Sequence, residues 1–222
     1  YIRGEFGRGA KILDRALGEA RARGYLGPRV MGKDYALDML VHRGAGAYEC
    51  GEETALIESL EGKRGVPRVK PPFPAIVGLY GKPTIVNNVE TLCNVPHILV
   101  RGVAWYKGLG TEKSPGPKVY SISGDVARPG VFEGPMGTPL IQLIEWAGGL
   151  TEGQKLKAVW PGGAATPVLT AAEAEKVLMD FENPRNFGSL MGSPGTMVLG
   201  DKRCVVGAAT RLTHFFEEDS CG

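Results

Sequence analysis

The sequence predicts an α/β part followed by an α+β part. Two observations indicate the first part, namely a helical apolar stripe near residues 12–20 and an alternating apolar segment at 35–41 that is followed by another helical stripe. The third observation is a set of short strand patterns around a helix pattern beyond residue 117. With 222 residues, of which 43% are hydrophobic, the chain is long enough for more than one domain.

The first part is expected to begin with a helix and a strand. Apolar residues from Ile12 to Ala20 have helical spacing, and Gly24 is expected to end that helix. Residues 35–41 alternate between apolar and polar side chains, which predicts a strand with one buried face. A second helix is expected over 54–61, with Leu56, Ile57 and Leu60 on its buried stripe and Gly62 at its end.

The turn between that strand and the second helix contains glycines and two carboxylates. Gly44, Gly46 and Gly51 lack a Cβ, so a planar ligand could approach the backbone closely. The amino end of a helix favours an anionic ligand, and a phosphate or a flavin edge is therefore expected here. An ordinary turn, in which Glu52 and Glu53 merely complement the helix dipole, is the alternative.

Prolines at 71, 72 and 74 are expected to stiffen the next segment and to hold it extended. Lys70 and Phe73 would then offer a cation and an aromatic ring to a dinucleotide. The alternative is a rigid surface connection.

A pair of asparagines precedes the following helix. Asn87 is expected to cap it, because Glu90 follows three residues later as in a capping box. Asn88 would then be available to a heterocycle such as a flavin. Pro96 is expected to kink or shorten the helix.

The second part is expected to begin after a linker at 111–117. Residues 118–124 and 130–133 predict a hairpin, and further strands are expected near 157–159, 166–169 and 196–199. Thr138 is expected to cap a helix with Pro139 in its first turn and Gly148 and Gly149 at its end. The last helix pattern starts near Arg203, and its apolar face contains Ala208, Leu212, Phe215 and Phe216.

Composition excludes several classes of function. A net charge of +2 gives no electrostatic footprint for nucleic acid, and no apolar run has the length of a membrane-spanning helix. The three histidines lack metal-ligand spacing. The four cysteines form no Cys-x-x-Cys pair, so they give no iron–sulfur signature by themselves and fit a reducing cytoplasm.

The run from Gly44 to Leu60, the Lys70–Pro74 segment and the Val86–Leu92 segment together resemble the NADH-binding flavoprotein subunit of respiratory complex I. Related diaphorase subunits of NAD-linked hydrogenases and formate dehydrogenases share these motifs. The resemblance extends from Tyr1 to Gly222 and implies a partial Rossmann-like FMN-binding domain at 1–113. It also implies a ubiquitin-like, soluble-ligand-binding β-grasp domain at 114–200 and the first helix of a helical 4Fe-4S domain at 201–222.

The resemblance implies a site that holds FMN with NADH stacked against it. No side chain is expected to be a catalyst. Glu49 departs from the family, which commonly has an apolar residue there. The residues expected around FMN are Tyr48, Gly51, Glu52, Val86, Asn87, Asn88 and Thr91, those expected to reach NADH are Glu53, Lys70 and Phe73, and Cys221 is expected as a 4Fe-4S ligand.

The turn at 44–54 and the segment at 86–91 are expected to converge on one cleft. The family comparison further implies an internal fragment: the rest of both pockets would precede Tyr1, and residues 220–222 would open a longer cluster motif. Weak FMN binding and no activity by itself are therefore expected.

The implied function is hydride transfer from NADH to FMN and onward electron transfer through iron–sulfur clusters to quinone. The implied partners are other peripheral-arm subunits, especially the 2Fe-2S thioredoxin-like subunit, and the implied location is the cytoplasm, at the inner face of the cell membrane, through those partners. A diaphorase subunit of a hydrogenase or formate dehydrogenase is one alternative. A β-grasp binding module, in which only residues 114–200 act, is the other.

Overall fold

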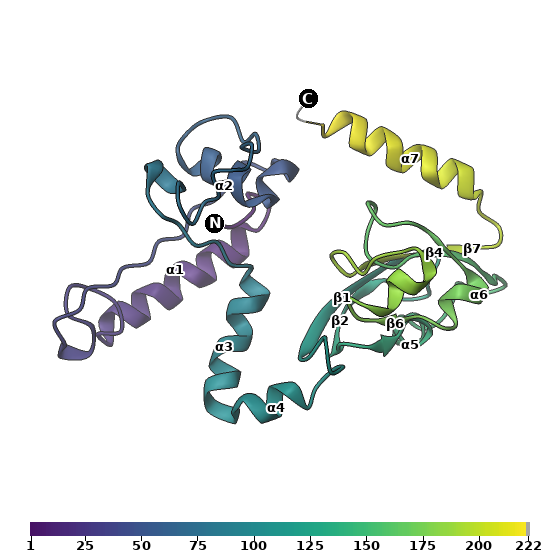
Figure 1. Ribbon diagram of the computed structural model, residues 1–222, viewed down its shortest axis with the longest axis horizontal. Coiled ribbons are helices and arrows are strands. Elements are labelled where there is room, and N and C mark those ends of the chain that lie inside the picture. The colour runs from purple at the N-terminus through teal and green to yellow at the C-terminus, as the bar shows by residue number, and fades with distance from the viewer. Residues whose placement is uncertain (221–222) are drawn as a thin grey trace. The chain divides into compact units, whose positions relative to one another are not determined.

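The computed structural model describes residues 1–220 and contains two compact units, Tyr1–Val86 and Asn87–Glu218 (Figure 1). The predicted domain limits at residues 113 and 200 stay predictions, because a compact unit and a family domain are defined by different criteria.

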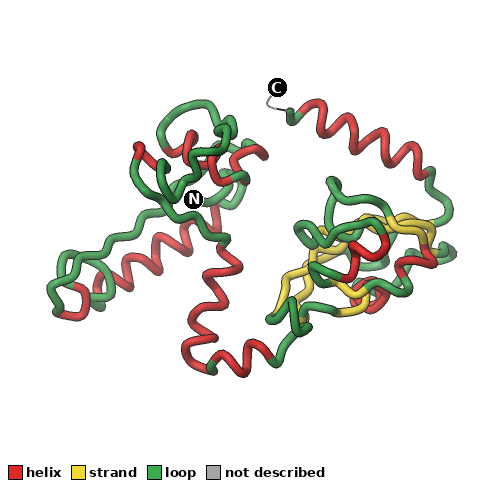
Figure 2. Tube along the Cα trace, viewed as in Figure 1, coloured by secondary structure: helices red, strands yellow, loops and turns green. Residues whose placement is uncertain are grey.

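The first unit consists of helices and loops (Figure 2). Helix α1 spans Gly7–Ala22 and helix α2 spans Glu53–Leu60, both close to the predicted positions. Single helical turns of the 3-10 type lie at Val30–Gly32, Tyr48–Gly51 and Leu79–Gly81. The backbone leaves α1 and α2 through Gly24 and Gly62, whose φ angles of +73° and +77° favour glycine.

The strand predicted at 35–41 is wrong. Within this segment only Leu37 takes part in a β-bridge, an isolated antiparallel one to Gly27, and residues 35–40 are exposed. An alternating pattern forms a strand only where a neighbouring strand accepts its hydrogen bonds and a core covers one face. Neither condition is met along 35–41 in the described part of the first unit.

The core of the first unit is small and lies around α2. Ala55 and Ile57 are completely buried, and Cys50 is buried beside them in the preceding turn. The hydroxyl groups of Tyr1 and Ser59 are hydrogen-bonded at 3.0 Å, which ties the start of the chain to α2.

The second unit is built on a five-stranded sheet with the order β2-β1-β7-β4-β5. Its central pair, β1 with β7, is parallel, and its other pairs are antiparallel. The strands are β1 (Pro117–Gly124), β2 (Gly130–Pro135), β4 (Leu156–Trp160), β5 (Leu169–Thr170) and β7 (Gly195–Gly200), and a separate two-stranded pair joins β3 (Thr138–Pro139) to β6 (Leu178–Met179).

Five helical segments complete the second unit. They are α3 (Val89–Arg101), α4 (Val103–Lys107), α5 (Leu140–Trp146), α6 (Ala171–Ala174) and α7 (Val205–Glu218), with a 3-10 segment at Asn183–Phe187. The predicted hairpin and the predicted last helix are confirmed as β1–β2 and α7.

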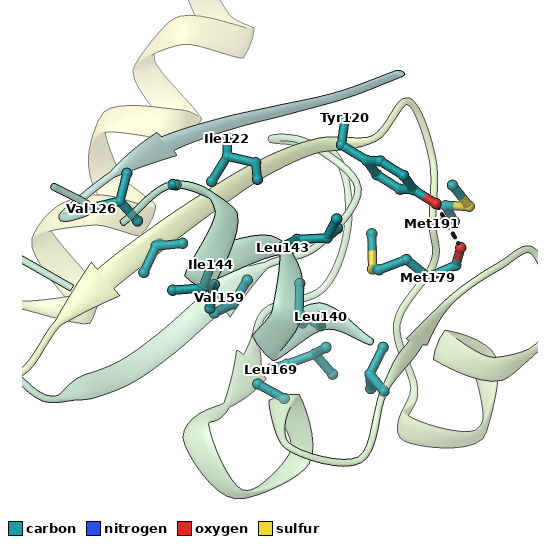
Figure 3. Close-up of a cluster of buried hydrophobic side chains, with 14 of the residues drawn as sticks. Tyr120, Ile122, Val126, Leu140, Leu143, Ile144, Val159, Leu169, Met179 and Met191 are labelled. Carbon is teal, nitrogen blue, oxygen red and sulfur yellow. Dashed lines mark hydrogen bonds between the residues drawn. The ribbon is translucent and has the colours of Figure 1, made fainter. Parts of the chain in front are cut away.

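The main core lies between α5 and the sheet (Figure 3). Leu140 and Leu143 of α5 are completely buried, as are Tyr120 of β1 and Val159 of β4. Tyr120 keeps its hydroxyl within hydrogen-bonding distance of the carbonyl oxygens of Pro135, at 3.0 Å, and Met179, at 3.3 Å. Burial raises the pKa of Tyr120 to about 12.

Four predictions of local structure in this unit are corrected. Thr138 does not cap α5, because its hydroxyl donates to the carbonyl of Pro135 at 2.7 Å and Pro139 precedes the helix without a side-chain cap. The strand expected at 166–169 is two residues long and lies at Leu169–Thr170. The expected linker is anchored, because Ser114 is buried and donates to Glu182 at 2.7 Å.

The fourth correction concerns Pro96, which lies inside α3 without shortening it, whereas a kink at this residue stays a prediction. A proline removes one backbone donor. Here the residues on both sides keep helical structure, so the helix runs on to Arg101.

We expect Tyr120→Phe to lower the free energy of unfolding of the second unit by about 1–1.5 kcal/mol, because two carbonyl oxygens lose a buried donor. Because the folded-state pKa is raised, this tyrosine also favours folding below its ordinary pKa of 10 and loses that contribution as the pH rises through about 12. Urea unfolding followed by tryptophan fluorescence measures both effects. Tyr35→Phe, at an exposed position, is the control, and equal losses for the two variants would contradict the prediction.

Candidate functional site

The residues predicted around the cofactors fall into both compact units. Tyr48, Gly51, Glu52, Glu53, Lys70, Phe73 and Val86 belong to the first, and Asn87, Asn88 and Thr91 belong to the second. Convergence of the two groups on one cleft stays a prediction. The predicted cluster ligand, Cys221, lies outside the described residues.

Glu52 caps the amino end of α2 with its own carboxylate. Its Oε2 atom accepts hydrogen bonds from the backbone N–H groups of Thr54, at 2.8 Å, and Ala55, at 2.9 Å, and from the Thr54 hydroxyl at 2.5 Å. This carboxylate therefore fills the position at which the sequence predicted a bound anion, since it already satisfies the helix donors. The expectation that a phosphate docks on these N–H groups is thereby corrected.

Lys70 joins the two adjacent carboxylates. Its Nζ atom lies 2.8 Å from Oε1 of Glu52 and also contacts the carboxylate of Glu53. One cation thus offsets two anions at the start of α2, where the helix dipole adds further positive potential. The sequence assigned these three residues to one site, and the structure brings them together.

These contacts shift the pKa values of both partners. Partial burial alone would raise the pKa of Glu52, but hydrogen bonds from Lys70, Thr54 and Ala55 outweigh it and lower this pKa to about 2. Hydrogen bonds to Glu52 and then to Glu53 raise the pKa of Lys70 above its ordinary value. Glu52 therefore stays ionised across the physiological pH range.

The proline-rich segment is bent rather than extended, which corrects the predicted geometry. Residues 70–72 form a bend, and the peptide bonds Lys70–Pro71 and Pro71–Pro72 are cis. The bend turns Lys70 back toward α2, while Phe73 stays 56% exposed. The cation of this segment is thus held by protein carboxylates, and its ring is open to solvent.

Arg68 fastens the start of this segment. Its guanidinium group contacts Glu58 at 2.5 Å and Glu61 at 2.9 Å, and it donates to the carbonyl of Gly78 at 3.1 Å. Its backbone N–H donates to the Thr54 hydroxyl at 2.8 Å. Sequence reasoning missed Arg68 and Thr54, because the contacts of Arg68 reach across seven to fourteen residues of sequence and no local pattern marks them.

The glycines of the turn have different roles. A Cβ on Gly44 would lie 2.4 Å from the Tyr1 hydroxyl, so the close approach predicted for a ligand at this position is made by the protein itself. Gly46 adopts a φ of +93°, which favours glycine. At Gly51 no atom lies within 4 Å of a built Cβ, and nearby Tyr48 is 60% exposed. Gly51 and Tyr48 therefore leave open surface for a ligand.

In the second unit, Asn88 rather than Asn87 caps α3. The Oδ1 atom of Asn88 accepts the N–H of Glu90 at 2.7 Å. Glu90 is not part of a capping box, since its carboxylate binds Lys118 at 2.6 Å and the backbone N–H of Val119 at 2.8 Å. The cap therefore lies at Asn88 and not at Asn87 as predicted, because the backbone turns into the helix one residue later than expected. The ligand-binding roles of the two asparagines stay predictions.

Thr91 lines a cavity of about 300 Å³ between α3 and the sheet domain, together with Asn94, Tyr106 and Lys118. Polar side chains of the first turn of α3 therefore face a cavity. The structure describes residues 1–220. In that range no helix has the length and apolarity needed to cross a bilayer, and no cluster of three or more His, Cys, Asp or Glu side chains could hold a metal ion.

Comparisons with known families match two regions of the chain. Residues 1–97 match the family described as the Nuo51 FMN-binding domain, and residues 119–168 match the SLBB domain.

The whole chain is similar to F subunits of NADH-quinone oxidoreductases and to an NADH dehydrogenase flavoprotein. It is 52% identical over 223 residues to the NADH-quinone oxidoreductase F 2 subunit of Rhizobium meliloti and 47% identical over 222 residues to the corresponding F subunit of Mycobacterium tuberculosis, covering 53% and 50% of these relatives. It is 48% identical over 224 residues to NADH dehydrogenase (ubiquinone) flavoprotein 1, mitochondrial, of Dictyostelium discoideum, of which it covers 47%. The chain thus spans about half the length of these relatives.

Solved structures of an NAD+-reducing NiFe-hydrogenase are also similar. The H2-reduced state matches with a TM-score of 0.81 and 36% identity over 99% of this chain and 36% of the other. The air-oxidised state matches with a TM-score of 0.77 and 39% identity over 95% and 35% of the two chains.

We expect Glu52→Gln to remove part of the acid sensitivity of the first unit. Because the folded-state pKa is lowered from 4.5 to about 2, the ionised side chain stabilises the fold fully above pH 4.5 and loses this contribution as the pH falls to 2. Urea unfolding followed by the amide signal of Ile57 at several pH values measures it. Glu49→Gln, with the same change of charge three residues earlier, is the control; a pH profile for Glu52→Gln that matches the wild type would refute the prediction.

We expect Asn88→Ala to destabilise α3 by about 1 kcal/mol, because a helix loses its side-chain cap. Asn87→Ala is the matched control and should change stability much less, since Asn87 does not provide the cap. Amide exchange of the first turn of α3 distinguishes the two. If Asn87→Ala lost more amide-exchange protection than Asn88→Ala, Asn87 would be the cap, as the sequence predicted, and this prediction would be wrong.

Proposed function

We infer that this chain forms part of an NADH-oxidising flavoprotein, because it belongs to the family of NADH-quinone oxidoreductase F subunits. The observation that carries the proposal is the juxtaposition of Glu52, Glu53 and Lys70 within the region that matches an FMN-binding domain. The proposed reaction of the whole protein is oxidation of NADH by FMN, with electrons passing through iron–sulfur clusters to quinone.

The domain assignment is part of this proposal. Residues 1–113 would be the carboxyl-terminal part of a Rossmann-like FMN domain, residues 114–200 a β-grasp domain, and residues 201–222 the first helix of a 4Fe-4S domain. The β-grasp assignment is supported by the parallel central pair β1–β7, the antiparallel outer strands and a helix packed on the sheet. The SLBB match to residues 119–168 lies within the same range.

The open surface of the first unit fits a planar cofactor. Tyr48 and Phe73 expose aromatic rings, and Gly51 presents backbone without a side chain. We propose Tyr48, Gly51, Glu52, Val86, Asn87, Asn88 and Thr91 as the residues of this chain that contact FMN. Glu53, Lys70 and Phe73 would contact NADH, and Cys221 would be a ligand of a 4Fe-4S cluster.

When bound, FMN supplies the two-electron acceptor for hydride and the one-electron donor for a cluster. The protein's own residues orient and hold the ligands. Phe73 can stack on a base of the dinucleotide, and Lys70 can exchange a carboxylate for a phosphate oxygen. Glu52 keeps its negative charge next to the cofactor, because its pKa of about 2 prevents protonation at neutral pH.

The partners proposed for the whole protein are peripheral-arm subunits of complex I, including a 2Fe-2S thioredoxin-like subunit. Association with the inner face of a cell membrane would come through those partners. The similarity to an NAD+-reducing hydrogenase favours a second candidate, a diaphorase subunit of a hydrogenase-type complex. Both candidates use the same flavin and dinucleotide site.

We expect Lys70→Ala to weaken NADH binding several-fold and to leave FMN affinity unchanged, because only the dinucleotide would contact this cation. Phe73→Ala should weaken NADH binding about fivefold, which corresponds to the loss of about 1 kcal/mol of stacking. Quenching of FMN fluorescence and NADH titration of the FMN-loaded chain measure these affinities.

Lys82→Ala, which removes a cation elsewhere in the first unit, is the matched control. Unchanged NADH affinity in both Lys70→Ala and Phe73→Ala would make the proline-rich segment a surface connection. Failure of the wild-type chain to quench FMN, at millimolar chain concentration, would leave residues 114–200 as a binding module instead.

A further inference from the structure

Thr54 lies at the centre of the contacts that hold the candidate site together. Its side chain is only 1% exposed, although it is polar. Its hydroxyl donates to Oε2 of Glu52 at 2.5 Å and accepts the backbone N–H of Arg68 at 2.8 Å. A single buried hydroxyl thus joins the start of α2 to the segment that carries Lys70.

The hydroxyl is also one of three donors that hold one Glu52 oxygen and leave the other to face Lys70. Oε2 accepts hydrogen bonds from three donors, namely the Thr54 hydroxyl and the N–H groups of Thr54 and Ala55. Oε1 is directed to the ammonium group of Lys70 at 2.8 Å. Valine has nearly the same shape as threonine but cannot make either hydroxyl contact.

Arg68 fixes the same segment from its other side. Its guanidinium group spans Glu58 and Glu61 on and after α2 and the carbonyl of Gly78. The fork of donors holds three acceptors at once, which an ammonium group cannot reproduce in this geometry. Lys70 follows two residues later, so its distance from Glu52 and Glu53 depends on this attachment.

We propose that Thr54 and Arg68 are positioning residues, which hold Lys70 against the two carboxylates and so set the charge that the site presents to a nicotinamide dinucleotide. The inference rests on the proposed function for its ligand, but the positioning itself is a property of the unliganded chain. Neither residue needs to touch the dinucleotide.

NMR titration of the chain tests the positioning without any ligand. The Cδ signal of Glu52, assigned with Glu52→Gln, and the Nζ signal of Lys70, assigned with Lys70→Arg, report the two ionisations. Thr54→Val should raise the Glu52 pKa from about 2 by about one unit, because a hydrogen bond to the carboxylate is lost. It should lower the Lys70 pKa, because the segment that carries Lys70 loses its attachment to α2 and the ammonium group moves away from the carboxylates. Thr54→Ser, which keeps the hydroxyl, should restore both values.

Thr196→Val is the matched control. Thr196 is also buried, and its hydroxyl donates to the carbonyl of Pro161 in the second unit at 3.0 Å, so its loss should not move either titration. Arg68→Lys retains the charge and loses the fork, and it should lower the Lys70 pKa. If Thr54→Val unfolds the first unit, Arg68→Lys tests by itself whether the attachment of this segment positions Lys70.

A folded Thr54→Val chain with unchanged Glu52 and Lys70 titrations would overturn the proposal, as would an unchanged Lys70 titration in Arg68→Lys. Addition of NADH to the FMN-loaded wild type distinguishes failure of the positioning hypothesis from failure of the proposed NADH-binding function. A Lys70 signal that shifts with NADH in the wild type, and at a several-fold higher NADH concentration in Thr54→Val, supports both. If the titrations shift as expected but NADH leaves the wild-type signal unchanged, the positioning stands and the proposed function fails.

Discussion

The carboxylate of Glu52 is the constraint on which the candidate site depends. It begins α2 by accepting two backbone N–H groups, and it holds Lys70 with its second oxygen. Without it, the first turn of α2 would lose its cap. Of its two carboxylate partners, Lys70 would then retain only Glu53. Local helix structure and the placement of a distant cation therefore share one side chain.

Because Glu52 occupies the N–H groups at the start of α2, this helix end does not offer them to a ligand. A free helix start attracts a bound phosphate through its N–H groups and dipole. Here an internal carboxylate takes that position, so binding of an anionic ligand has to rely on Lys70 and on backbone elsewhere in the turn. In the proposed function, selectivity would depend on the exchange of Lys70 between protein carboxylates and ligand oxygens.

A second carboxylate has a similar function in the other unit. Glu90 holds the start of α3 to β1 by binding Lys118 and the N–H of Val119. Strand β7 pairs with β1 over residues 121–124. The Val119 N–H precedes this paired stretch and donates to the Glu90 carboxylate. The segment with Asn88 and Thr91 is thereby fixed to the sheet domain, within which the SLBB match lies.

The sequence by itself determined most helices, the β1–β2 hairpin and the identity of the charged residues at the site, because these depend on local periodicity and on motif chemistry. It did not determine whether residues 35–41 form a strand, which asparagine caps α3 or how the proline-rich segment bends. A strand at 35–41 would need a partner strand, and the bend brings Lys70 to carboxylates 17 and 18 residues away in sequence. The cap depends on the residue at which the backbone turns into α3. Thr54 and Arg68 belong to the same class, because only tertiary structure brings the Arg68 N–H to a hydroxyl 14 residues away. This contact and the hydrogen bond to Glu52 together satisfy the buried hydroxyl in α2.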